Sequence, residues 1–67
     1  MSQPILVKLK KQRNELTDTR TDIDAYMTTP EFIALPPGTR NLVRLHIDSI
    51  NASLRALVLL IQYLESN

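Results

Sequence analysis

The stretch from Arg40 to Ser66 constrains the fold of this chain most, because its apolar residues recur at alternating steps of four and three. That spacing places them on one face of an α-helix, as a continuous stripe with a heptad period. No Pro or Gly interrupts the stretch, so the sequence predicts one long helix from about residue 39 to 65. The residues of the stripe are Val43, Ile47, Ile50, Leu54, Leu57, Ile61 and Leu64.

An N-terminal helix is predicted from about residue 4 to 28. Pro4 suits the first turn of a helix, and Ser2 or Gln3 can cap it. Arg13 and Arg20 stand on a heptad stripe that is otherwise apolar. The apolar members of this stripe are Leu6, Leu9, Leu16, Ile23 and Met27, whereas Lys8, Lys11, Glu15, Asp18 and Asp22 lie on the outer side.

The segment from residue 29 to 38 predicts a short helical connector. Thr29 can cap its first turn, Pro30 fits the first helical position, and Glu31 suits the positive end of the helix dipole. We expect the apolar side chains of Phe32 and Leu35 to close the end of a hairpin made by the two long helices.

The prolines Pro36 and Pro37, followed by Gly38, end the connector, since proline disfavours the helical region for the residue before it. Thr39 is then expected to cap the long second helix. The predicted fold is therefore all-α, a single domain over residues 1–67 in which two antiparallel helices form a hairpin with a short helical connector.

Self-association is expected because the chain has only 67 residues, with no Cys and one His. A core of this size yields little net stability, and the usual aids are disulfides, a metal or oligomerisation. Because the chain has no thiol and only one His, oligomerisation is the favoured aid. The second helix also carries a second apolar stripe, made of Leu42, Leu45, Ala52, Ala56, Leu60 and Tyr63.

Residues 56–61 of the second helix are apolar on every side. A helix of that kind is buried on every side, which one partner helix cannot achieve. The small residues Ser49, Ala52, Ser53 and Ala56 would allow close helix approach. We therefore predict a homo-oligomeric helical bundle built on the second helix.

The balance of basic and acidic residues argues against a nucleic acid as the partner. Eight basic and seven acidic residues give a net charge of +1, whereas nucleic-acid binders usually show a clear basic excess. A nucleic-acid interface through the cluster from Lys8 to Arg13 is therefore the least favoured interpretation.

The sequence shows neither a secretory signal nor an apolar run long enough to span a membrane. The apolar residues at the start precede the charges, which is the reverse of a secretory signal, and the longest uninterrupted apolar run, Ala56 to Ile61, is shorter than a membrane span. A soluble, cytoplasmic protein without membrane contact is expected.

Arg13 and Arg20 are the least usual residues, because they occupy positions of an apolar stripe. Two guanidiniums one heptad apart can hold phosphates through forked hydrogen bonds. The alternative, which we favour on the residues alone, is that their aliphatic stems pass over apolar surface while the guanidiniums reach solvent or an Asp of a neighbouring subunit.

Further candidates lie near the connector. Tyr26 can stack on a base, although packing at the end of the hairpin is the favoured interpretation. Arg40 and Arg44 share one side of the second helix and can face a phosphate, but a pair between Arg44 and Asp48 is favoured. His46 adjoins the apolar stripe and is expected to be an interior or interface residue.

Catalytic and metal motifs are not recognisable. No Ser, Cys or Asp arrangement around His46 suggests a nucleophile, and no carboxylate pair stands on an apolar face. Asp18, Asp22 and Asp24 lack the glycine and terminal glutamate of a calcium loop, and Gly38 is the only glycine available for a phosphate loop. The chain is expected to be a non-enzyme without a metal or another cofactor.

The connector and its flanks carry a pattern typical of one group of small phage proteins. A charged helix is followed by Ser or Thr, then Pro-Glu-Phe, then Leu-Pro, and a second helix starts with Arg and two apolar residues. The matching positions here are Thr29, Pro30, Glu31, Phe32, Leu35, Pro36, Arg40, Leu42 and Val43. The segment from Leu16 through Leu57 resembles a family known by its relation to a gene product of crAss-like phage. That family often continues with Gln, Met and Tyr where His46, Ile50 and Ser53 stand here.

Such proteins are similar in plan to the helical hairpins of phage anti-defence sponges. Those hairpins oligomerise and sequester the cyclic nucleotide messengers of bacterial CBASS or Thoeris immunity without cleaving them. The resemblance implies a cyclic di- or trinucleotide, or a cyclic ADP-ribose type ligand, held between subunits in the host cytoplasm. The ligand contacts it implies are Tyr26, Arg20 and Arg40, with Arg13 and Arg44 behind them. The alternative is a helical interaction module that docks on a host or phage protein.

Overall fold

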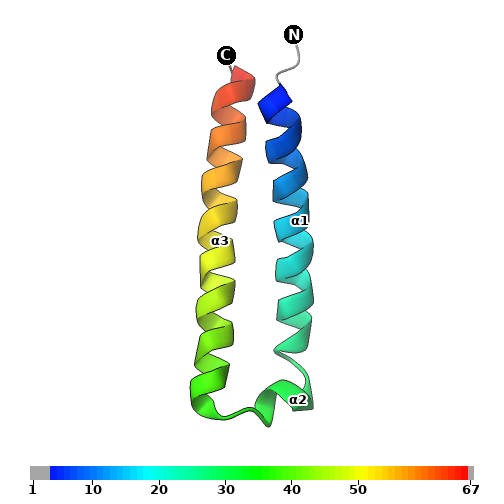
Figure 1. Cartoon of the computed structure of the whole chain (residues 1–67), viewed down its shortest axis with the longest axis vertical. Coiled ribbons are helices and arrows are strands. Elements are labelled where there is room, and N and C mark those ends of the chain that lie inside the picture. The colour runs from blue at the N-terminus through cyan, green and yellow to red at the C-terminus, as the bar shows by residue number, and fades with distance from the viewer. Residues whose placement is uncertain (1–3, 67) are drawn as a thin grey trace.

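The computed structural model describes residues 4–66, which form three helices and no strand. Helix α1 spans Pro4–Tyr26, the short helix α2 spans Pro30–Ile33, and helix α3 spans Pro37–Ser66. Figure 1 shows α1 and α3 running antiparallel side by side, with α2 crossing between them at one end. The predicted all-α hairpin with a helical connector is confirmed.

The interface between α1 and α3 contains the predicted stripes. Ile47, Ile50, Leu54, Leu57 and Ile61 of α3 are buried, whereas the terminal members of that stripe, Val43 and Leu64, are half-buried. The stripe of α1 is half-buried along its whole length and consists of Leu6, Leu9, Arg13, Leu16, Arg20 and Ile23, and the half-buried Met27 continues it just beyond the helix. No residue of α1 is fully buried. The two helices touch along one line. We call this line of contact the seam; on α3 it consists of the buried residues from Ile47 to Ile61.

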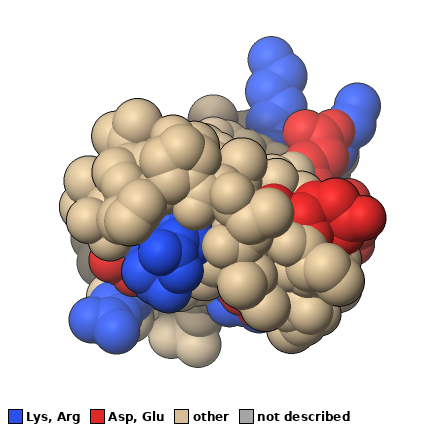
Figure 2. All heavy atoms as spheres, turned by 90° about the horizontal axis from the view of Figure 1, so that it is seen from below, with Lys and Arg blue, Asp and Glu red and all other residues tan. Residues whose placement is uncertain are grey.

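The shape shows how little surface this seam covers. The molecule measures 51 × 15 × 13 Å and has a Cα radius of gyration of 15.3 Å. A compact domain of this length would have a radius of about 11 Å. The hairpin is therefore a rod with one layer of contact, and the side of α3 turned away from α1 remains uncovered. Figure 2 views this rod end-on, from the connector end.

The connector begins as the sequence predicted. Thr29 has extended backbone angles, φ −86° and ψ 155°, and its hydroxyl oxygen accepts a hydrogen bond from the backbone N–H of Phe32 at 3.3 Å. Pro30 takes the first helical position. Phe32 is buried against the hairpin and Leu35 is half-buried, so an aromatic ring closes this end of the seam.

The predicted cap of the second long helix is wrong. Thr39 lies inside α3, which begins at Pro37, and the backbone N–H of Arg40 donates to the carbonyl of Pro36 at 3.0 Å. Pro37 itself starts the helix, because its fixed φ suits the first helical position and its missing N–H would have no partner there. The first long helix also ends sooner than expected, at Tyr26, and Met27 and Thr28 form a turn.

These two threonines give a test of the helix starts. Thr29→Ala removes a cap and is expected to lower the free energy of unfolding by about 0.5–2 kcal/mol. Thr39→Ala is the matched control, because Thr39 is exposed and caps nothing, and alanine is the better helix former. Thermal unfolding followed by circular dichroism compares the two variants. An equal loss in both would contradict the assigned start of α3.

Helix α3 also has the length and composition of a helix that could cross a membrane. The longest uninterrupted apolar run is short, but apolar residues predominate over a longer part of this helix. Core helices of soluble proteins share this length and composition.

Candidate functional site

The structure does not gather the five predicted contact residues in one place, and three of them fall into two separate regions of the hairpin. Tyr26 and Arg44 belong to a cluster around Phe32 at the connector end. The rings of Tyr26 and Phe32 meet edge to face, with centroids 5.9 Å apart and planes at 79°. The Arg44 guanidinium carbon lies 5.7 Å from the centroid of the Phe32 ring. Favourable aromatic and cation–π contacts thus bind the end of α1 and the start of α3 to the connector.

The position of Arg44 corrects the expected pair with Asp48. Within residues 4–66 the one ion pair joins the Lys10 ammonium to the Glu65 carboxylate at 2.9 Å, near the other end of the hairpin. Arg44 turns toward Phe32 because that ring, fixed by the connector, offers an apolar surface for its stem and a π-face for its charge. The packing interpretation of Tyr26 agrees with its contact to the same ring.

Arg40 lies one helical turn before Arg44 and is half-buried. Its Nε is covered by protein and has no hydrogen-bond partner among the described residues. A covered donor without an acceptor costs about 1–3 kcal/mol. Among the five predicted contact residues, Arg40 is therefore the one with a covered donor that no described residue accepts.

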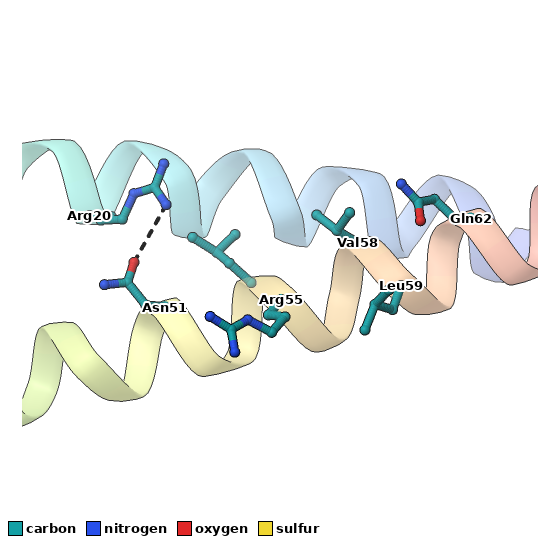
Figure 3. A pocket seen from close by; sticks show the side chains of 7 residues that line it. Arg20, Asn51, Arg55, Val58, Leu59 and Gln62 are labelled. Atoms are coloured by element: carbon teal, nitrogen blue, oxygen red, sulfur yellow. Dashed lines mark hydrogen bonds between the residues drawn. The ribbon is translucent and has the colours of Figure 1, made fainter.

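Arg20 belongs to the second region, an open groove between α1 and α3. Its Nη1 donates to the side-chain oxygen of Asn51 across the hairpin, at 3.4 Å. The groove has a volume of about 530 Å³. Figure 3 shows the hydrogen bond from Arg20 on α1 to Asn51 on α3, and the other labelled side chains belong to α3. The lining residues are Arg20, Asn51, Leu54, Arg55, Val58, Leu59 and Gln62.

Two lining residues of this groove, Asn51 and Arg55, were missed at the sequence level. Helical spacing places them one turn apart on the same side of α3. What the sequence lacked was the register of the hairpin, which sets Arg20 opposite Asn51. With the connector bounds known, that register follows, because the connector fixes which turns of the two helices face each other.

Arg13 joins neither region. Its Nε and Nη2 donate to the side-chain oxygen of the adjacent Asn14 at 3.4 and 3.3 Å, and it does not line the groove. His46, expected to be an interior or interface residue, is exposed on the hairpin, so the interior placement is wrong and the interface placement stays a prediction. It stands one residue before the buried Ile47, and that step rotates it out of the seam.

A third feature is the outer face of α3, which we define by the apolar residues turned away from the seam. Leu42, Leu45 and Leu59 each remain 60% exposed or more. The complete face consists of Leu42, Leu45, Ala52, Ala56, Leu59, Leu60 and Tyr63, all exposed. Leu59 also lines the groove, so the groove and the outer face of α3 are continuous.

Seen from the connector end, basic side chains lie at separate places on the hairpin rather than on one side. In the end-on view of Figure 2, blue Lys and Arg atoms appear at separate places among uncharged residues, with acidic groups between some of them. This distribution differs from the single basic stripe of a nucleic-acid interface.

The chain matches no protein-family model, no curated protein and no solved structure. The hairpin itself offers three candidate functional features: the cluster around Phe32, the groove at Arg20 and the outer face of α3.

Proposed function

We propose that this protein is a phage-encoded hairpin that self-associates through the outer face of α3 and binds a cyclic nucleotide immune signal in the host cytoplasm. The assembly holds the ligand and does not cleave it, so the protein is not an enzyme. Sequestration lowers the free concentration of the signal and thereby protects the phage.

The observation that carries the proposal is the exposed outer face of α3 beside the basic groove. Monomeric soluble proteins seldom expose a long contiguous apolar surface, and such surfaces mark interaction sites. Burying apolar surface contributes roughly 25 cal/mol per Å². A second copy can cover the leucines of this face, and the exposed small residues Ala52 and Ala56 between them permit close approach of two helices.

Symmetry supports the binding of a ligand by such an assembly. In a closed oligomer each basic residue is repeated by the symmetry axis, so two copies of one groove can face the two phosphates of a cyclic dinucleotide. Guanidinium forks hold phosphates, and Tyr26, 40% exposed beside Phe32, retains surface for stacking on a base. The proposed contacts are Arg20, Arg40 and Tyr26, with Arg13 and Arg44 in supporting positions.

Native mass spectrometry tests both parts of this proposal. The purified protein is incubated with a mixture of cyclic di- and trinucleotides and cyclic ADP-ribose isomers at micromolar concentration. We expect an oligomer that gains discrete ligand masses, with the ligand recovered intact after denaturation. A monomer without adducts would overturn the proposal, and recovery of a cleaved ligand would overturn its non-catalytic part.

The same exposed leucines favour one alternative function, a helical interaction module that docks on a host or phage protein. This function predicts a monomer in solution, with the outer face of α3 left free for the partner. A stable homo-oligomer that protects the outer face from solvent would exclude it. Protection of the leucines can be followed by the intensity loss of their methyl NMR signals with a soluble paramagnetic agent.

A further inference from the structure

The groove between α1 and α3 brings together two arginines from different helices. Arg20 comes from α1 and Arg55 from α3, and both line the same open space of about 530 Å³. Sites for small ligands commonly measure 300–1,000 Å³. The groove therefore has room for a nucleotide-sized molecule, and Figure 3 shows Arg20 and Arg55 among the side chains that line it.

Neither arginine forms an ion pair with a carboxylate of the described residues. The one ion pair among residues 4–66 joins Lys10 and Glu65, and no carboxylate lines the groove. Arg20 makes a single long hydrogen bond to a neutral amide, at 3.4 Å, and no described residue accepts a hydrogen bond from Arg55. Each guanidinium has five N–H donors, so most of this donor capacity remains open. An anion with several oxygens matches it, because phosphate accepts forked bonds from arginine.

The rest of the groove is suited to an organic group attached to that anion. Leu54, Val58 and Leu59 present apolar surface on the α3 side, and the side-chain amides of Asn51 and Gln62 flank it. Apolar walls with a few polar groups are typical of sites for small ligands. An aromatic base can rest on such a wall while an amide donates to or accepts from its edge.

We propose that this groove is the phosphate-binding site of the protein, in which Arg20 and Arg55 hold a phosphodiester and the Leu54–Leu59 wall contacts the nucleobase. The inference rests on the proposed function for the choice of ligand, a cyclic dinucleotide, and adds Arg55, Asn51 and Gln62 to its site. It places the ligand beside the outer face of α3, since Leu59 belongs to both, so an added copy of the hairpin can close the groove.

The test compares charge-removing variants of the intact chain. Arg20→Gln and Arg55→Gln are each expected to weaken the binding of cyclic di-AMP and cyclic di-GMP by roughly tenfold to a hundredfold, as loss of a charge-assisted bond implies. Lys11→Gln is the matched control, because it also removes one positive charge from α1 but at an exposed position that does not line the groove. Isothermal titration calorimetry measures the affinities, and melting curves check that each variant is folded.

A second measurement distinguishes a failure of the proposed groove site from a failure of the proposed function. Amide NMR spectra are recorded during titration with AMP and with inorganic phosphate, and the side-chain signals of Asn51, Gln62 and Arg55 are followed. Shifts at these groups without any binding of cyclic dinucleotides would support the groove and overturn the proposed function. Binding of a cyclic dinucleotide that is unchanged in Arg20→Gln and Arg55→Gln would overturn the groove and leave the function standing. No shift and no binding would overturn both.

Discussion

Replacing Ile61 by alanine is expected to unfold most of the protein at 37 °C. Ile61 is the most deeply buried side chain of the seam, 2% exposed. Truncating a buried Ile to Ala typically costs 2–5 kcal/mol, because transfer energy is lost and a cavity remains. The total stability of small domains is of the same size, and here one seam supplies the core. Circular dichroism during heating should show a large fall of the melting temperature and a reduced helical signal before heating.

The matched control for this variant is Ile5→Ala, which makes the same chemical change at a site that is 50% exposed. Alanine favours a helix more than isoleucine does, which offsets part of the lost contact. We expect the Ile5→Ala protein to melt within a few degrees of the parent. Similar melting temperatures for the two variants would show that the seam between α1 and α3 is not the main core.

The seam was predictable because it depends on periodicity alone. A heptad repeat selects one face of a helix whatever lies opposite it, so Ile47, Ile50 and Leu54 were correctly expected to be buried. The cap at Thr29 was predictable for a similar reason, since a hydroxyl followed by Pro and Glu acts within its own turn. Local chemistry and regular spacing therefore gave the architecture.

The candidate site was less predictable, because it depends on what meets across the hairpin. Arg13 and Arg20 are equivalent in the heptad, yet one bonds its neighbour Asn14 and the other reaches Asn51. The difference comes from the register of the two helices, which the sequence pattern does not specify. Arg44 similarly lies over Phe32, a ring that is distant in the helical pattern and close in the fold.

The second large effect is expected from Leu45→Glu, which should dissociate the proposed oligomer into monomers. Leu45 is 63% exposed on the outer face of α3, so within one hairpin the substitution meets solvent and should change stability by about 0.5 kcal/mol or less. In an assembly closed through this face it would bury an unpaired carboxylate, which costs several kcal/mol. Native mass spectrometry and light scattering at micromolar concentration measure the change in mass.

Val7→Glu is the control for this experiment, since Val7 is also 63% exposed but lies on α1, away from the outer face of α3. We expect it to keep the parental mass. Dissociation should also lower the melting temperature of the Leu45→Glu protein, because subunit binding stabilises the folded state by mass action, and the parent should melt higher as its concentration rises. If both variants and the parent share one mass and one melting temperature, the outer face of α3 is not an interface between copies of this chain. In that case its exposed leucines would instead favour docking on a different protein.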